Sequence, residues 1–303
     1  MDVRELKSAW SFLKEVFQSW SNSKTPRLGA ALAYYTVFAV APLFIIAIAV
    51  AGFWFGEETA RKQLFDQVNA LVGKEGGQAI QSLVVAANKP KTGTWATVGA
   101  AFTLLAAATA VFVELQDALN TIWGVQRKEG GGIKLFIKDR ILSFAMILGV
   151  GFLLLVSLIL NAVLSAFDSF ASGSATGSHI FWSIVNFATS LGVVTLLFAM
   201  IFKILPDVKI TWRNVWMGAL VTALLFNLGK FLIGVYLGRS SMVSVYGAAG
   251  SLIVILLWVY YSAQILFFGA EFTRIYAEKH GSVEAREAPQ RRQRQAFSAS
   301  PAH

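Results

Sequence analysis

The chain has 303 residues, of which 56% are hydrophobic and 14% are charged, with a formal net charge of +9. Soluble proteins contain about 25% charged residues, so this composition is typical of a membrane protein. The absence of cysteine excludes disulfides and thiolate chemistry. The three histidines, His179, His280 and His303, do not have the spacing of metal ligands, so we expect neither a metal nor another cofactor.

The first predicted element is an amphipathic helix within residues 1–28. Its apolar residues recur at helical spacing, and they are Leu6, Trp10, Leu13, Phe17 and Trp20. Lys7 and Lys14 lie off this stripe, a composition typical of a helix at a membrane surface. The helix would either bind the membrane or regulate the protein, or it would simply anchor and orient the segment that follows.

Six apolar segments between residues 29 and 275 are each long enough to cross the hydrocarbon core, which takes a helix of about 20 residues. They lie at about residues 29–53, 94–113, 141–165, 180–204, 214–237 and 248–270. Pro42 interrupts the first segment, where the lost backbone hydrogen bond predicts a kink. Gly234 and Gly238, at the outer end of the fifth segment, have the spacing that permits close helix contact. The predicted fold class is therefore all-α, a polytopic membrane protein with six transmembrane helices.

The distribution of Lys and Arg predicts the orientation of these spans, because positive residues accumulate on the cytoplasmic side. Of the 26 Lys and Arg, 19 lie before the first span, in the second and fourth loops, and after the sixth span. Six lie in the other loops, and Lys230 lies inside a span. We therefore expect both termini in the cytoplasm.

Two segments outside the membrane differ in composition. The exterior loop 54–93 contains two apolar helical stripes separated by Gly73, Gly76 and Gly77, which predicts a helical hairpin over the outer mouth of the bundle. This hairpin would either cover a cavity or serve as a packing element. The basic tail 276–303 has few apolar residues, and we expect it to be disordered, either solvated or in contact with anionic lipid or RNA.

Lys230 lies within the fifth predicted span, where an ionisable side chain costs about 2.5–3.5 kcal/mol at the helix centre. Asn227 precedes it by three residues and shares its helix face. The ammonium would either snorkel outward or pair with a carboxylate such as Glu57 or Glu58. Alternatively, it faces a water-filled or lipid-accessible cavity and attracts an anionic group. On this second interpretation Lys230 and Asn227 are the candidate substrate-binding residues.

A second set of polar residues lies at the predicted cytoplasmic boundary. Glu114, Asp117 and Asn120 follow the second span at a spacing of three, which predicts a shared helix face. Glu271 and Arg274 form an i, i+3 pair at the end of the sixth span. These residues either form structural ion pairs between helices or act in gating or proton coupling.

Four segments occur in a characteristic order: RLGAALAYYTVFAVAPL, LQDALNTIWGV, LPDVKITWRNVWMGALVTALLFNLGKFLIGVY and VYGAAGSLIVILLWVYYSAQILFFGAEFTRIYA. Together they resemble the YihY/virulence factor BrkB family of bacterial inner-membrane proteins, over roughly residues 5–280. The resemblance implies an inner-membrane location, six transmembrane helices and cytoplasmic termini. Members of that family have carried the label ribonuclease BN, and some are linked to serum resistance or lipid A export.

RNA cleavage needs a metal cage or a histidine acid–base pair within a water-accessible basic groove. The scattered histidines and short loops do not provide one, so we expect no enzyme activity and no nucleic-acid partner. Two classes of function remain. One is a transporter or flippase-like protein for an anionic lipid or envelope component, and the other is a non-transporting scaffold or regulator of envelope integrity. Membrane lipids are the expected partners, and the oligomeric state is left open, a homo-oligomer included.

Overall fold

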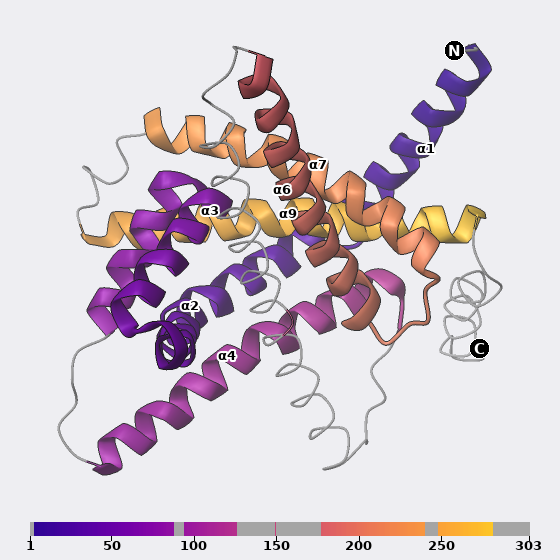
Figure 1. The fold of residues 1–303 in the computed structure, drawn as a ribbon. Helices are drawn as coiled ribbons and strands as arrows, with labels where there is room; N and C mark the ends of the chain where they lie inside the picture. The colour runs from indigo at the N-terminus through magenta and orange to yellow at the C-terminus, as the bar shows by residue number, and fades with distance from the viewer. Residues whose placement is uncertain (1–2, 88–93, 126–148, 150–176, 240–247, 281–303) are drawn as a thin grey trace, which may run out of the picture.

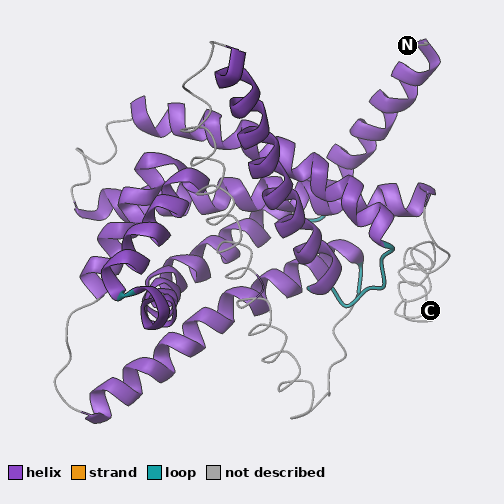
Figure 2. Cartoon of the chain, viewed as in Figure 1, coloured by secondary structure: helices purple, strands orange, loops and turns teal. Residues whose placement is uncertain are grey.

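The computed structural model describes residues 3–87, 94–125, 149, 177–239 and 248–280. In this part of the chain every regular element is a helix, which confirms the all-α class (Figure 2). The helices are α1 (Val3–Asn22), α2 (Thr25–Phe55), α3 (Glu57–Ala87), α4 (Thr94–Trp123), α6 (Gly177–Ile204), α7 (Trp212–Arg239) and α9 (Ala248–His280).

Four stretches of helix are long and apolar enough to cross a membrane. They are Thr25–Phe53, Phe187–Ile204, Trp212–Tyr236 and Leu252–His280. They overlap the first, fourth, fifth and sixth predicted spans, and the last one continues beyond the predicted end at residue 270. α4 begins where the second span is predicted, whereas the predicted third span, 141–165, lies outside the described residues. The count of six spans and the cytoplasmic location of the termini stay predictions.

α9 lies along the middle of the bundle and packs against α7, α2, α3, α1 and α4, while α6 packs against α7 (Figure 1). Two apolar cores follow its length. The first core joins α4, α6 and α7 to the second half of α9, and its largest buried members include Leu119, Ile122, Trp123, Phe202 and Phe267. The second core joins α2 and α3 to the first half of α9, and it includes Phe65, Ile80, Val84, Val254 and Ile255.

α7 and α9 approach closely along a seam to which each helix contributes one glycine and one threonine. A Cβ atom added at Gly218 would lie 2.8 Å from the Cβ of Thr273, and one added at Gly269 would lie 2.9 Å from the Cβ of Thr222. The order of these pairs shows that the helices are antiparallel. Each threonine hydroxyl donates to the carbonyl of the glycine four residues earlier, at 2.6 Å in α7 and 2.7 Å in α9.

Gly234 and Gly238 are the glycines predicted to permit close helix contact, and the surroundings of Gly238 lie outside what the structure describes. Among the described residues, no atom lies within 4 Å of a Cβ added at Gly234. Close contacts with α9 form instead at Gly218 and at Gly229, where an added Cβ would lie 2.5 Å from the Cδ1 of Ile265.

The two halves of α3 lie against each other. In a straight helix, residues eight apart are separated by about 12 Å along the axis, yet a Cβ added at Gly77 would lie 3.4 Å from the Cα of Asn69. Phe65 in the first half and Val84 in the second half belong to the same apolar core. The chain thus folds back close to the glycines at which the sequence predicts a hairpin, and it packs on α2, α7 and α9.

α2 continues past a proline in its interior. The helix runs from Thr25 to Phe55, and Pro42 lies buried inside it, after the buried residues Val40 and Ala41. A proline in this position removes one backbone hydrogen bond, so the surrounding packing must stabilise the helix here. The kink itself stays a prediction.

We expect Gly218→Ala and Gly269→Ala to destabilise the protein by about 1–3 kcal/mol, because the added methyl group forces α7 and α9 apart. Gly234→Ala is the matched control, and there the better helix propensity of alanine should leave the stability unchanged or slightly higher. Thermal unfolding of the purified variants in detergent measures the difference. Equal stability of all three variants would contradict the tight seam.

Candidate functional site

A buried carboxylate joins α1 to α9. Glu271 is fully buried and accepts hydrogen bonds from the Oγ of Ser19 at 3.0 Å, from the Oγ of Ser23, and from the Nε of Arg274 at 2.9 Å. Arg274 also donates to Glu278 at 2.6 Å and to the Oγ of Ser19 at 2.6 Å. We call these five residues the α1–α9 network.

Helical spacing explains why these residues meet. Glu271, Arg274 and Glu278 lie at i, i+3 and i+7 on α9, so they share one face of that helix. Ser19 and Ser23 lie four residues apart on the facing segment of the chain. A buried carboxylate is costly unless it is paired and hydrogen-bonded. The guanidinium and the two hydroxyls meet this requirement.

Contacts on both sides of the network hold α1 in place. Phe12 packs edge-on against Phe272 with 5.1 Å between the ring centroids. Lys279 forms an ion pair with Glu15 and lies 5.0 Å above the ring of Phe12. α1 is therefore docked along the last turns of α9.

The turn between α1 and α2 is fixed by its own hydrogen bonds. Lys24 adopts a left-handed conformation with φ of 55°, which reverses the chain between the two helices. Thr25 donates from its Oγ1 to the carbonyl of Trp20 at 2.7 Å, and Gln264 of α9 donates to the carbonyl of Thr25 at 3.3 Å. The turn is thus attached to α9 as well.

A second polar cluster joins the end of α4 to the connection between α6 and α7. The side-chain amide of Asn120 donates to Asp207 at 3.0 Å, and the backbone N–H of Asp207 donates back to Asn120 at 2.8 Å. Gln116 donates to the same carboxylate oxygen at 3.3 Å. Both amide side chains are buried, whereas Asp207 is exposed. We call this cluster the α4 clamp.

The structure places the three predicted α4 residues in different surroundings. Glu114 is half-buried, Asp117 is exposed and Asn120 is buried. Three residues turn an α-helix by about 300°, so each residue of this set lies about 60° around the helix axis from the one before it. The first and last residues of the set, Glu114 and Asn120, therefore point in directions about 120° apart. Of the three, Asn120 belongs to the α4 clamp.

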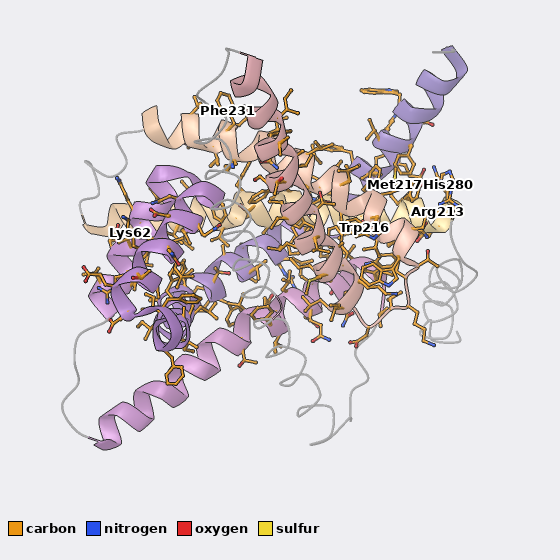
Figure 3. All side chains as sticks on the ribbon, viewed as in Figure 1. Lys62, Arg213, Trp216, Met217, Phe231 and His280 are labelled. Carbon is orange, nitrogen blue, oxygen red and sulfur yellow. The ribbon has the colours of Figure 1, made fainter. Side chains whose placement is uncertain are left out.

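Lys230 and Asn227 lie on α7, and both are half-buried. Asn227 donates to the carbonyl of Ala223 in its own helix at 2.9 Å. Lys230 precedes the end of the apolar stretch at Tyr236 by six residues, or roughly 9 Å along the axis. Figure 3 shows Phe231, the next residue, toward the opposite end of the bundle from Arg213 and His280. Lys230 is therefore distant from the α1–α9 network.

Sequence reasoning missed five members of the two clusters: Ser19, Ser23, Glu278, Gln116 and Asp207. The serines have i, i+4 spacing, and Asp207 follows a Leu-Pro pair just before α7, but neither pattern by itself identifies a partner. Among the described residues, no group of three His, Asp or Glu side chains could hold a metal ion.

We expect Arg274→Ala to destabilise the protein by about 3–5 kcal/mol, because it leaves Glu271 buried without its cation. Arg61→Ala is the matched control. It breaks an exposed i, i+4 ion pair with Glu57, which contributes about 0–1 kcal/mol. Thermal or denaturant unfolding in detergent measures both. Adding Glu271→Gln to Arg274→Ala should recover part of the loss, and equal effects of the two arginine variants would contradict a stabilising network.

Comparison with known proteins identifies the family. The model of the family described as virulence factor BrkB matches residues 16–295. A UPF0761 membrane protein of Actinobacillus pleuropneumoniae is 25% identical over 265 residues, which cover 86% of this chain and 92% of the relative. No solved structure matches the chain.

Two further relatives are longer than this chain. A UPF0761 membrane protein of Pseudomonas paraeruginosa is 27% identical over 86% of this chain and 61% of the relative. One of Saccharophagus degradans is 24% identical over 88% of this chain and 60% of the relative. The chain thus spans about three fifths of these two proteins. The family match includes the α4 clamp and the whole α1–α9 network, and the chain belongs to the virulence factor BrkB family of membrane proteins.

Proposed function

We propose that this protein handles an anionic lipid or a lipid-linked envelope component in the bacterial inner membrane, as a transporter or flippase-like protein. The observation that carries the proposal is Lys230, an ionisable side chain retained within a helix that is apolar enough to span the membrane. Such residues are costly in hydrocarbon, and they commonly mark substrate or ion pathways.

The surroundings of Lys230 suit a ligand with a charged head and apolar chains. Leu228, Phe231 and Leu232 are exposed on α7, so lipid chains can lie along this helix. Lys230 would attract the phosphate, and Asn227 lies one turn earlier on the same helix face, where its side-chain amide would donate a second hydrogen bond. In this proposal the α3 hairpin serves as a lid.

The two polar clusters at the other end of the bundle supply the second half of the proposal. The α1–α9 network and the α4 clamp attach three helices, α1, α4 and α9, and the connection between α6 and α7 through charged, hydroxyl and amide side chains. Glu271, Arg274 and Asn120 would act in gating, with Glu114 and Asp117 beside them as candidates for proton coupling. We propose no enzymatic activity, no cofactor and no nucleic-acid partner, with both termini in the cytoplasm.

One observation favours the alternative, a scaffold or regulator of envelope integrity that transports nothing. Within the α1–α9 network, and separately within the α4 clamp, the polar side chains hydrogen-bond to one another. This is expected if their role is to hold the helices in place. The two functions differ in whether lipid binds at Lys230 and in whether lipid then moves across the membrane.

Mass spectrometry of the lipids retained by the purified protein tests the binding step. We expect one anionic lipid class to be enriched in the wild type and to fall about tenfold or more in Lys230→Gln and Lys230→Ala, because a charge-assisted hydrogen bond contributes about 1.5–3 kcal/mol. Lys62→Gln is the matched control, since Lys62 is an exposed lysine on α3. Unchanged retention in the Lys230 variants would contradict a headgroup site.

Translocation of the retained lipid in proteoliposomes then separates the two functions. A transporter moves that lipid between leaflets, and Lys230→Arg, which keeps the charge, should retain more activity than Lys230→Gln. Specific retention without any translocation would favour the scaffold.

A further inference from the structure

α1 has two apolar faces, and α9 covers only one of them. Val16 is fully buried and Phe12 packs against Phe272, so this face is occupied by protein. The second face contains Trp10, Leu13 and Phe17, whose exposed fractions are 72%, 44% and 58%. These three residues lie at i, i+3 and i+7 and therefore form one stripe, which we call the outer stripe.

The outer stripe is continuous with the membrane domain. Trp20, one turn after Phe17, packs against the first core, and α2 begins at Thr25, three residues after α1 ends. α2 is apolar enough to span a membrane from that residue onward. The N-terminal part of α1 projects away from the other helices (Figure 1). Its outer stripe therefore begins where the apolar surface of the bundle ends.

Three of the described side chains around the outer stripe are positively charged. Lys14 is exposed and lies beside the stripe, and Lys24 and Arg27 are exposed at the turn that follows. The nearby acidic side chain, Glu15, forms an ion pair with Lys279 on the docked side of the helix. Trp, Leu and Phe flanked by lysine suit the boundary between headgroups and acyl chains of an anionic bilayer.

We propose that α1 binds the anionic lipid surface of the leaflet at this end of the bundle, with the outer stripe inserted among the acyl chains. Lys14, Lys24 and Arg27 contact the phosphates, while the α1–α9 network keeps the opposite face docked on α9. This surface is separate from Lys230, so it does not depend on the transport proposal.

The chain contains no cysteine, so a single introduced cysteine can carry a spin label without background. Leu13→Cys and Phe17→Cys place the label on the outer stripe, and Gln18→Cys places it at an exposed polar position as the matched control. The full chain is reconstituted in phosphatidylcholine vesicles with or without 30% phosphatidylglycerol. Accessibility to oxygen and to a water-soluble nickel complex then reports the depth of each label.

We expect the labels at 13 and 17 to be accessible to oxygen and protected from nickel in the anionic vesicles, and the label at 18 to be accessible to nickel. Each of Lys14→Gln, Lys24→Gln and Arg27→Gln should lower the ratio of inserted to water-exposed label about fivefold. Water exposure of all three labels, or protection from both reagents by a protein contact, would overturn the proposal. Equal insertion without phosphatidylglycerol would overturn its anionic specificity.

A measurement without labels provides an independent check. The fluorescence of Trp10, taken as the difference between the wild type and Trp10→Phe, should be quenched by brominated phosphatidylglycerol in the vesicles. Absence of this quenching would contradict insertion of the outer stripe.

Discussion

The close approach of α7 and α9 is the contact on which the rest of the bundle depends. In a membrane, helices gain little from the hydrophobic effect, so close packing around small residues must hold them together. Gly218 and Gly269 allow this packing, and α9 can then contact α2, α3, α1 and α4 on its other sides. The two apolar cores lie on either half of α9 because this one helix is shared by all of these contacts.

The buried or membrane-depth ionisable residues are of two kinds, which differ in how the free-energy cost of their location is offset. At the end where α9 finishes, Glu271 is buried but satisfied by two serines and an arginine, so its burial stabilises the attachment of α1. Lys230 lies near the other end, within the stretch of α7 that is apolar enough to cross a membrane. The first arrangement has an evident structural benefit. Lys230 is an ionisable side chain at a position where such residues commonly mark substrate or ion pathways, and this is the reason to seek a ligand there.

The sequence predicts local features well and long-range partners poorly. Length and apolar composition locate α2, α6, α7 and α9, and the glycines after Leu71 locate the fold-back of α3, because these depend on neighbouring residues alone. Glu271 and Arg274 are recognisable as a pair for the same reason. Ser19 and Asp207 are not, since their partners lie 252 and 87 residues away and depend on how the helices pack. Packing also decides that Gly218, rather than Gly234, meets a neighbouring helix.

The seam between α7 and α9 has a local twofold symmetry, because each helix presents a glycine to the threonine of the other. A change of volume on one helix is therefore felt at a single position on its neighbour. Within the family we expect the side-chain volumes at positions 218 and 273 to be inversely related, and likewise those at positions 222 and 269. A larger side chain at one position of a pair will accompany a smaller one at the other, so that these two pairs evolve as units.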